Sequence, residues 1–302
     1  MFDPLVTGHW SLVTHVTRVF GVMGFPISHS LSPVMHNAAF QALGLDAIYA
    51  PFEVTPRQLS PVLQGLQVMG VDGLNVTVPL KERLARLLSR TNLDPVAATL
   101  GAVNTLAQRD GRLVGYNTDV EGFRRALVEE LRCDVRRKRV LLLGAGGAAR
   151  AAAWALAQGN PEVLWVANRT AAHANRLARW LRRSTPRVTI EVVPFGRRST
   201  AKALVQTDVL VNATSLGLHP GDALPVDPSA MHKRLMVFDA VYAAPTTALV
   251  RQARRRGACA IDGLAMLLYQ GAESFRLWWQ REPPLDVMRR AVEQALRQRS
   301  QR

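Results

Sequence analysis

Lys81 follows the β-branched stretch "NVTVPLKE" at residues 75–82, in a chain that uses lysine at only four of its 38 basic positions. Arginine stays protonated at any accessible pH, whereas the pKa of a lysine falls when the side chain is buried, so a lysine can transfer a proton. A sequence that otherwise prefers arginine therefore favours a chemical role for Lys81. The ordinary alternative is a solvated surface lysine, which this residue by itself does not exclude.

A glycine-rich turn is the second feature that could do chemistry. The stretch "VLLLGAGGAAR" places Gly144, Gly146 and Gly147 directly after an apolar strand and before an alanine-rich helix. The first glycine permits the tight turn, the second lets backbone N–H groups approach a pyrophosphate, and Ala149 allows close packing of helix on strand. The positive end of the helix also points at the phosphates. The pattern predicts a dinucleotide site, with a merely structural turn as the alternative.

The end of the next strand indicates which dinucleotide binds. A site specific for NAD usually presents Asp or Glu about 20 residues on, where it accepts from the ribose 2′-hydroxyl. This chain has Asn168-Arg169-Thr170 there and no carboxylate. Because an arginine can pair with a 2′-phosphate, the sequence favours NADP over NAD. The alternative for Arg169 is one more surface arginine.

The elements that position these residues form two alternating βα series. The first series has expected strands at 18–26, 47–54 and 73–79, helices at 32–45, 55–70 and 80–88, and a hairpin within 101–119 around Arg109-Asp110-Gly111. Ser32 is expected to cap the first helix, with Pro33 in its first turn. Such alternation predicts a mainly parallel sheet.

The pattern then restarts, which predicts a second, doubly wound unit. Its expected elements are a helix at 121–131, a strand, turn and helix within 138–158, a strand and turn at 162–170, a helix at 171–181, and strands at 189–195, 208–215 and 235–242. A helical tail begins near Gly263. We therefore expect an α/β protein of two domains. The first is an N-terminal α/β domain of residues 1–118, completed by helices at 263–302, and the second is a Rossmann-type NADP domain of residues 119–262.

Composition places broad limits on function. A chain of 302 residues with 48% hydrophobic and 20% charged residues is typical of a globular protein, and its length suits two domains. We find no apolar run long enough for a membrane span, no secretion signal in the first 18 residues, and only Cys133 and Cys259 as cysteines, so the cytoplasm is the expected location. The net charge of +15 could attract nucleic acid, but the arginines are dispersed and no nucleic-acid-binding signature accompanies them.

Nine ordered motifs spread over most of residues 19–280 resemble the shikimate dehydrogenase family. They are "GFPISHSLSPVMHN" (24–37), "NVTVPLKE" (75–82), "GAVNT" (101–105), "GYNTD" (115–119), "GAGGAAR" (144–150), "NRT" (168–170), "NATSLG" (212–217), "DAVY" (239–242) and "DGLAMLLYQ" (262–270). The resemblance implies a reversible, NADPH-dependent reduction of 3-dehydroshikimate to shikimate, in the route to aromatic amino acids. Any one motif could arise by chance, whereas nine in family order are specific.

The resemblance also implies roles for matching residues. Lys81 and Asp119 would form the catalytic pair, in which Lys81 donates a proton as hydride reaches the ketone carbon and Asp119 orients the ammonium. Substrate would be held by Ser30 and Ser32 at its carboxylate, and elsewhere by Asn75, Thr77, Asn104, Asp119, Tyr242 and Gln270. The cofactor would be held by Gly144, Ala145, Gly146, Gly147, Ala148, Asn168, Arg169, Thr170, His173, Thr214, Ser215, Ala240, Gly263 and Met266.

Two departures from the family pattern affect selectivity. His173 stands where the family often has a second basic residue after "NRT", which predicts a weaker hold on the 2′-phosphate. Pro245 lies one place later than is common after the tyrosine, which affects the loop near Tyr242. Three alternatives stay open: a quinate/shikimate dehydrogenase that uses both NAD and NADP, a non-catalytic relative that senses metabolites, and a nucleic-acid binder.

The remaining expectations concern partners and metals. We expect a small-molecule substrate, no specific nucleic acid, no membrane partner, and a monomer or homodimer. His29 and His36 lack an apparent acidic or cysteine partner, so they are expected to be structural and no metal is predicted. Trp278 and Trp279 are expected to pack the C-terminal helix onto the first domain.

Overall fold

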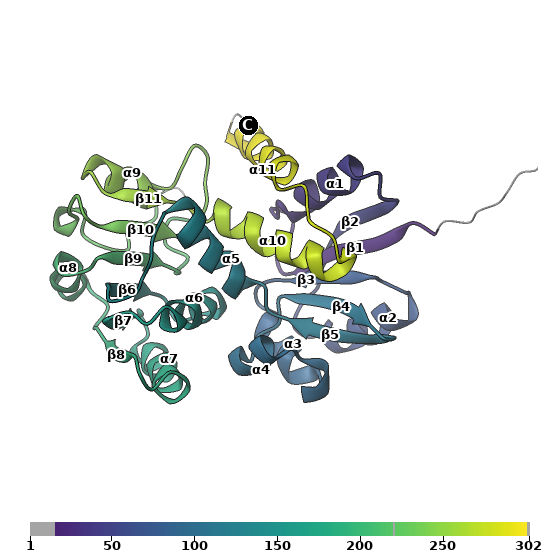
Figure 1. The fold of residues 1–302 in the computed structure, drawn as a ribbon, viewed down its shortest axis with the longest axis horizontal. Helices are drawn as coiled ribbons and strands as arrows, with labels where there is room; N and C mark the ends of the chain where they lie inside the picture. The colour runs from purple at the N-terminus through teal and green to yellow at the C-terminus, as the bar shows by residue number, and fades with distance from the viewer. Residues whose placement is uncertain (1–15, 220, 301–302) are drawn as a thin grey trace, which may run out of the picture.

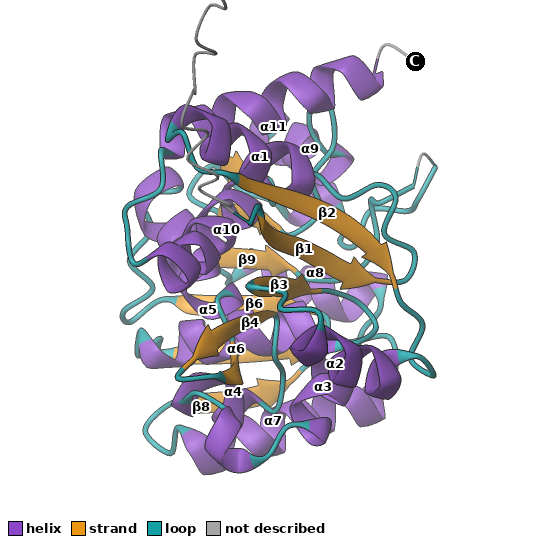
Figure 2. Cartoon of the chain, turned by 90° about the vertical axis from the view of Figure 1, so that its right-hand side faces the viewer, coloured by secondary structure: helices purple, strands orange, loops and turns teal. Residues whose placement is uncertain are grey.

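The structure is a computed structural model that describes residues 16–219 and 221–300. Its strands form two separate sheets, and helices α5 (Asp119–Arg125) and α10 (Leu264–Trp279) lie between the halves of the molecule that are built on them (Figure 1). Helices cover the strands of both halves, as Figure 2 shows from the side. The predicted α/β class is confirmed, with a mixed first sheet and an entirely parallel second sheet.

The first sheet has the strand order β2–β1–β3–β4–β5. Its strands are β1 (Arg18–Gly24), β2 (Ala47–Glu53), β3 (Gly73–Val76), β4 (Thr105–Arg109) and β5 (Arg112–Tyr116). The first three are parallel, whereas β4 runs antiparallel to β3 and forms a hairpin with β5. Asp110 and Gly111 adopt positive φ angles of 49° and 73° at the hairpin turn, which matches the right-handed twist of the strands.

Two helical layers enclose this sheet. On one face, a core that includes Phe20, Phe40 and Phe275 joins α1 (Ser32–Ala42), α10 and α11 (Leu285–Ser300). On the other face, a core that includes Leu74 and Leu84 is covered by α2 (Leu59–Val68), α3 (Lys81–Leu87) and α4 (Pro95–Leu100). The short 3-10 helix η1 (Arg90–Asn92) links α3 to α4.

The second sheet is doubly wound. Its six strands are all parallel in the order β11–β10–β9–β6–β7–β8, so the winding reverses between the neighbours β6 and β9. The strands are β6 (Arg139–Leu143), β7 (Val163–Ala167), β8 (Thr189–Val192), β9 (Val209–Asn212), β10 (Met236–Asp239) and β11 (Cys259–Ile261). Such reversals place ligand sites at the carboxyl ends of the strands.

Alternate residues of the central strand β6 face two different cores. Val140 and Leu142 point into the core covered by α5, the following π-helical turn η2 (Ala126–Glu130), α6 (Gly147–Gln158), α7 (Ala171–Ser184) and the start of α10. Leu141 and Leu143 point into the opposite core, which α8 (Arg197–Val205), the 3-10 helix η3 (Pro228–Ala230) and α9 (Ala248–Arg255) cover. Because both faces of β6 are buried, its sequence is an uninterrupted apolar run.

Helix α10 contributes to the cores of both halves. Met266 and Tyr269 pack into the core of the second sheet, whereas Phe275 and Trp278 pack into that of the first. As expected, Trp278 packs on the first sheet, where its indole N–H donates to the carbonyl of Leu106 at 2.9 Å. Because α10 belongs to both cores, the structure does not show where one domain ends and the other begins. The expected domains, residues 1–118 with 263–302 and residues 119–262, stay a prediction.

Several local expectations were wrong. Ser32 does not cap α1: Leu31 occupies the N-cap position without a side-chain hydrogen bond, and Ser32 is already helical. Helix α2 begins at Leu59 and not at residue 55, because Thr55 and the side chain of Gln58 form a hydrogen-bonded turn first. The strand expected at 73–79 ends at Val76. The backbone N–H of Thr77 still donates to the Met23 carbonyl of β1, but the Thr77 carbonyl accepts from the Leu80 N–H in a turn.

His36 is a buried structural histidine. Its ring is fully buried, stacks on Tyr49 with centroids 4.5 Å apart, and has no hydrogen-bond partner for either nitrogen among the described residues. Burial lowers the pKa of His36 from 6.5 to about 3. The folded chain therefore keeps His36 neutral in a pH range where the unfolded chain protonates it.

We predict that His36 makes the protein acid-sensitive. Because the folded pKa lies below the unfolded one, its stabilising contribution is complete above pH 6.5 and falls as the pH drops toward about 3. Between about pH 7 and pH 4.5 the loss should reach about 3 kcal/mol. Urea unfolding of the wild type and of His36→Leu at both pH values measures it. If both proteins lose equal stability on acidification, the assignment to His36 is wrong.

Candidate active site

Lys81 and Asp119 form an ion pair in the region where the two halves meet. The Lys81 Nζ atom lies 2.6 Å from Asp119 Oδ2, and the two side chains are only 16% and 6% exposed. The residues are 38 positions apart in the chain and come from different helices, α3 and α5. The structure therefore brings together the two residues expected to form the catalytic pair.

The position of Lys81 in its helix is unfavourable without this partner. Strand β3 ends at Val76, Leu80 donates its backbone N–H to Thr77 across a turn, and α3 begins at Lys81. A cation in the first turn opposes the helix dipole, at a cost of about 0.3–1 kcal/mol. Asp119 occupies the first turn of α5, where the dipole favours an anion. The pair therefore combines one misplaced charge with one well-placed charge.

Asn104 fixes the orientation of the Asp119 carboxylate. Its Nδ2 atom donates to Asp119 Oδ1 at 2.9 Å, while its Oδ1 atom accepts from the backbone N–H of Thr118 at 2.7 Å. Asn117 Oδ1 accepts from the backbone N–H of Asp119 at 3.1 Å. Both carboxylate oxygens of Asp119 thus have defined partners, so the carboxylate cannot rotate away from Lys81.

A buried polar network lies beside this pair. The Nδ2 atom of Asn75 donates to Ser274 Oγ at 2.8 Å and to Thr105 Oγ1 at 3.0 Å, and its Oδ1 accepts from the Tyr49 hydroxyl at 2.7 Å. Burial raises the pKa of the Tyr49 phenol well above its usual value, which keeps that hydroxyl a donor. Both ends of the Asn75 amide are engaged within the protein, so its contact with a substrate stays a prediction.

Sequence reasoning missed three members of this network: Tyr49, Thr105 and Ser274. A signal for Ser274 existed, because it lies one helical turn after Gln270 on α10 and donates to the Gln270 carbonyl at 3.0 Å. A polar side chain on the buried face of an otherwise apolar helix requires a partner. Tyr49 and Thr105 carried no comparable pattern in the sequence.

The other residues expected to bind substrate come from four separate segments. Ser30 is half-buried in the loop before α1, and its Oγ accepts from the backbone N–H of Ser32 at 3.3 Å. Thr77 is half-buried after β3, and Gln270 donates its Nε2 to the carbonyl of Leu267 at 2.8 Å. No described contact joins these residues to Lys81, so their roles stay predictions.

Tyr242 is held in place by the end of strand β10. The buried Asp239 carboxylate accepts from Asn212 Nδ2 at 2.8 Å, from the Thr247 hydroxyl at 2.6 Å and from the backbone N–H of Val241 at 3.2 Å. These bonds shape the loop that carries Tyr242, whose ring packs against the core of the first sheet. Tyr242 therefore reaches from the second half of the molecule to the first.

The glycine turn is shaped to receive a phosphate group. Gly144 has a φ of 112°, and a Cβ atom there would lie 2.6 Å from the carbonyl oxygen of Ala213. Gly146 and Gly147 differ, since a Cβ at either would meet nothing within 4 Å. The space in front of the α6 N-terminus is thus open, which suits the pyrophosphate of a dinucleotide.

A cavity of about 780 Å³ adjoins this turn. Of the residues expected to bind the cofactor, the cavity is lined by Gly144, Ala145, Gly146, Asn168, Arg169, Thr214 and Ser215. Sequence reasoning missed Arg197, which lines the same cavity and pairs with Asp227 at 2.9 Å. Its place directly after the third strand of a doubly wound unit was the available signal.

The other expected cofactor residues do not line this cavity. They are Gly147, Ala148, Thr170, His173, Ala240, Gly263 and Met266. Gly263 lies against Ala240, because a Cβ on Gly263 would be 2.2 Å from the Ala240 carbonyl oxygen. Met266 is buried in the core of the second sheet, and His173 is exposed on α7. Their contacts with a cofactor stay predictions.

In the part of the chain that the structure describes, no group of three or more His, Cys, Asp or Glu side chains could hold a metal ion. His29 is exposed on the loop before α1, whereas His36 is buried among aromatic rings. The absence of a metal requirement remains a prediction.

We predict different effects on stability from substitutions at two glycines of this turn. Gly144→Ala should destabilise the protein by about 2–4 kcal/mol, because its Cβ meets a backbone carbonyl and its positive φ disfavours alanine. Gly146→Ala should leave the melting temperature of the ligand-free protein almost unchanged, because its Cβ enters open space. Thermal melting of both variants is the measurement. Equal melting temperatures for the two would contradict the described turn.

Comparison with known proteins assigns three consecutive parts of the chain to related family models. Residues 22–106 match the shikimate dehydrogenase substrate binding domain, residues 126–241 match shikimate / quinate 5-dehydrogenase, and residues 263–293 match the shikimate 5'-dehydrogenase C-terminal domain. The matches follow the order of the two sheets and the C-terminal helices.

Relatives are similar over nearly their whole length. Shikimate dehydrogenase (NADP(+)) of Methanosarcina mazei is 46% identical over 281 residues, which are 92% of this chain and 99% of the relative. The crystal structure of shikimate 5-dehydrogenase from Thermus thermophilus in complex with NADP(H) and shikimate is 35% identical, with a TM-score of 0.81 and coverage of 92% and 100%. Quinate dehydrogenase from Corynebacterium glutamicum in complex with NAD is 31% identical, with a TM-score of 0.84 and coverage of 92% and 99%. With an ion pair beside a dinucleotide-type fold and these matches across both halves, the chain belongs to the shikimate dehydrogenase family.

Proposed function

We propose that this protein catalyses the reversible, NADPH-dependent reduction of 3-dehydroshikimate to shikimate. The observation that carries the proposal is the ion pair between Lys81 and Asp119, 2.6 Å apart and little exposed. The names of the relatives, shikimate dehydrogenase (NADP(+)), support the reaction and the cofactor. A fall in NADPH absorbance on addition of 3-dehydroshikimate tests it, and no fall at any substrate concentration would contradict it.

Lys81 moves the proton in the proposed mechanism. NADPH, when bound, would supply the hydride for the carbonyl carbon of the substrate. Negative charge then develops on the carbonyl oxygen, and the Lys81 ammonium stabilises this charge and donates the proton. In the oxidative direction, the uncharged Lys81 amine would accept the proton of the substrate hydroxyl. Asp119 keeps the ammonium in place and Asn104 holds the Asp119 carboxylate, so the donor is preorganised before substrate arrives.

The polar residues around the pair would hold a substrate that has a carboxylate and several hydroxyls. Ser30 and Ser32 would bind the carboxylate, and Thr77, Asn104 and Gln270 would line the ring. Tyr242 would lie beside the substrate near the nicotinamide. Asn75 would act chiefly by supporting Thr105 and Ser274, since its amide is engaged with them. Burial raises the pKa of the Tyr242 phenol, so Tyr242 would serve as a neutral hydrogen-bond donor.

The cavity beside the glycine turn fits the nucleotide part of NADP. Gly144 to Ala148 would hold the pyrophosphate, and Asn168, Arg169 and Thr170 would hold the adenosine phosphate. Arg197 adds a second arginine to the same cavity. It would compensate for His173, which stands at the position where the family often has another base and lies outside the lining. Thr214, Ser215, Ala240, Gly263 and Met266 would surround the rest of the cofactor.

Quinate is a second candidate substrate. The 31% identity to a quinate dehydrogenase in complex with NAD favours testing it. Quinate has one more ring hydroxyl than shikimate, and paired Ser30 and Ser32 suit the shikimate form. Turnover of both acids with both nicotinamide cofactors separates the two candidates.

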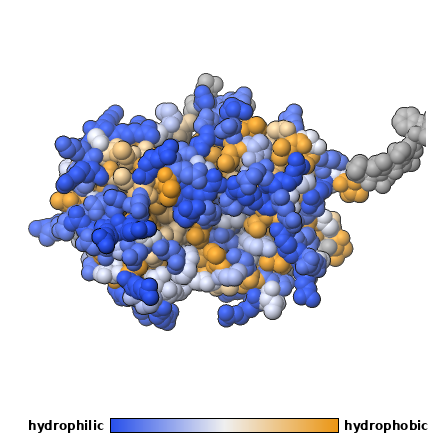
Figure 3. All heavy atoms as spheres, viewed as in Figure 1, coloured by the Kyte–Doolittle hydropathy of each residue, from blue (hydrophilic) through white to orange (hydrophobic). Residues whose placement is uncertain are grey.

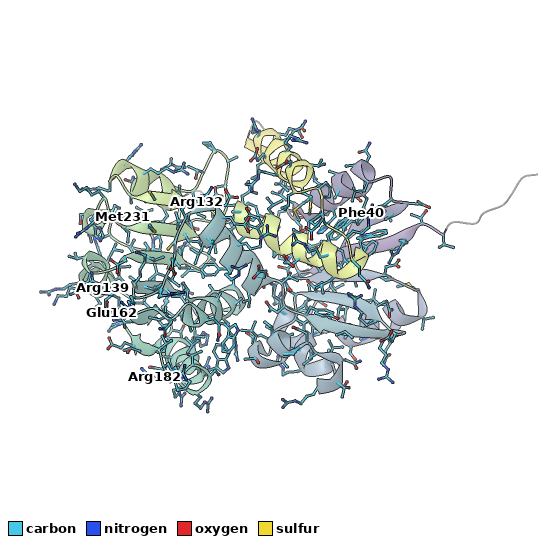
Figure 4. All side chains as sticks on the ribbon, in the orientation of Figure 1. Phe40, Arg132, Arg139, Glu162, Arg182 and Met231 are labelled. Atoms are coloured by element: carbon cyan, nitrogen blue, oxygen red, sulfur yellow. The ribbon has the colours of Figure 1, made fainter. Side chains whose placement is uncertain are left out.

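Several arginines of the second half have partners within the protein. Arg182 and Arg254 donate to the carbonyl oxygens of Ile190 and Ala260, which ties α7 and α9 to neighbouring strands. Arg139 and Arg182 lie at separate places around the second sheet (Figure 4). On the face drawn in Figure 3, hydrophilic residues are spread widely, with small apolar areas between them. This dispersal supports the proposal of small anionic ligands over a nucleic acid.

Location and assembly are also proposals. Cys133 and Cys259 are both free, which supports a cytoplasmic location. Among the described residues, no helix is both long and apolar enough to cross a membrane. A monomer or homodimer is proposed.

We predict that Lys81→Arg keeps the fold but lowers kcat by about 10²–10⁴-fold, because arginine retains the charge and cannot surrender the proton. Lys202→Arg, on the exposed face of α8, is the matched control and should have normal turnover. Steady-state kinetics and a melting curve of each variant measure this. Near-normal kcat in Lys81→Arg would exclude lysine as the proton donor.

Arg169→Ala should raise the KM for NADP about tenfold or more and change the KM for NAD by less than twofold, because only NADP carries the 2′-phosphate. Arg197→Ala should act in the same direction with a smaller effect. The control is Arg187→Ala, because Arg187 precedes β8 at the amino ends of the strands, whereas Arg169 follows the carboxyl end of the neighbouring strand β7. An equal effect of Arg169→Ala on both cofactors would refute the phosphate assignment.

A further inference from the structure

The last helix of the chain reaches the loop that carries Ser30. Met288 and Val292 anchor α11 in the core of the first sheet, where the helix packs beside α1 (Figure 1). In its last turn, Arg299 donates from Nη1 to the carbonyl oxygen of His29 at 2.6 Å and from Nη2 to that of Ser30 at 3.4 Å. One guanidinium therefore donates hydrogen bonds to two successive backbone carbonyls of the loop that is proposed to bind the substrate carboxylate.

The charge of the same guanidinium also acts on Tyr242, which comes from the other half of the molecule. Burial raises the pKa of the Tyr242 phenol, and the positive charge of Arg299 opposes that shift. Its charge thus acts on the tyrosine while its N–H groups hold the Ser30 loop. Arg299 therefore contacts the backbone of Ser30, one of the two residues proposed for the carboxylate end of the substrate.

The charges of the site leave that carboxylate without a counterion. Ser30 and Ser32 are neutral donors, and the charge of Lys81 is balanced by Asp119 at 2.6 Å. Moving a carboxylate out of water costs free energy unless a positive charge or enough hydrogen bonds replace the solvent. Among residues 16–219 and 221–300, the exposed Arg299 is bonded to carbonyl oxygens and forms no ion pair with a carboxylate. A guanidinium has five N–H donors, so further donors are available.

We propose that Arg299 is the substrate-binding cation of this site: it positions the Ser30 loop and supplies the countercharge for the substrate carboxylate. This inference rests on the proposed function. It gives the C-terminal helix a direct part in substrate recognition, in addition to its packing against α1. Arg299 does not touch the reacting carbonyl, so it acts on substrate affinity and not on proton transfer.

The test compares the full-length wild type with Arg299→Ala, Arg299→Lys and Arg290→Ala in shikimate oxidation with NADP. Arg290 is the matched control, because it is exposed on the same helix and nine residues away, on its opposite side. Arg299→Ala should raise the KM for shikimate about 5- to 20-fold, with kcat and the KM for NADP within about twofold. Arg299→Lys should restore part of the affinity, because it keeps the charge and loses the two-pronged grip. Arg290→Ala should match the wild type.

A second substrate separates charge from loop positioning. The methyl ester of shikimate lacks the negative charge, so Arg299→Ala should change its KM by less than about twofold. Raising the salt concentration should weaken shikimate binding in the wild type more than in Arg299→Ala. Melting curves check that each variant is folded.

Each outcome decides the proposal. An unchanged KM for shikimate in Arg299→Ala overturns it while the proposed function stands. Equal losses for the acid and the ester overturn the countercharge. An equal loss in Arg290→Ala would mean that Arg299 acts only through the general charge of the helix. If the wild type does not oxidise shikimate at all, the proposed function fails and this inference fails with it.

Discussion

The ion pair between Lys81 and Asp119 is the interaction on which the arrangement of this molecule depends. Two opposite charges that are mostly removed from solvent stabilise each other only when their separation and orientation are fixed, and removing one partner of such a pair costs about 3–5 kcal/mol. Here the separation is 2.6 Å, and Asn104 fixes the carboxylate from its other side. The turn before Lys81 and the start of α5 must therefore stay at a fixed distance and orientation to each other. The rest of the fold supplies that relation.

Helix α10 provides the mechanical link between the two ends of the pair. Close to its middle, a Cβ on Gly122 of α5 would lie within 2.7–3.0 Å of Gln270, so the two helices are in backbone contact beside Asp119. One turn later, Ser274 hydrogen-bonds Asn75, which belongs to the strand that leads to Lys81. The same helix thus holds Asp119 through packing and the Lys81 strand through polar contacts. A helix whose start packs in one core and whose end packs in the other is difficult to assign to one domain, and α10 is such a helix.

Several candidate site residues could be predicted from local sequence patterns. Three local features carried this information. They are the rare lysine after a β-branched strand, the glycine turn between strand and helix, and the absence of a carboxylate after the second strand. The alternating apolar runs also predicted both sheets, because strands buried on two faces leave few other patterns. Asp119 came from the family motif, and the structure brings it to Lys81.

Other features depend on tertiary packing and carried little or no local signal. Tyr49 and Thr105 join the network only because β2, β3 and β4 approach the same face of α10. Arg299 reaches Ser30 across 269 residues, a distance that no local pattern encodes. The expected cap at Ser32 failed because the loop before α1 uses Ser30 to bond the Ser32 N–H, so the helix begins one residue earlier than its sequence suggests. Arg197 differs, because its place after a strand of a doubly wound unit was a usable signal.

The most direct test of the central claim is a crystal structure of the protein with shikimate and NADP bound together. Our account predicts that Lys81 Nζ lies within about 2.6–3.2 Å of the substrate oxygen that alternates between ketone and hydroxyl, with Asp119 still bonded to the same ammonium. A complex in which that oxygen contacts a different side chain, and Lys81 points away from the substrate, would contradict it.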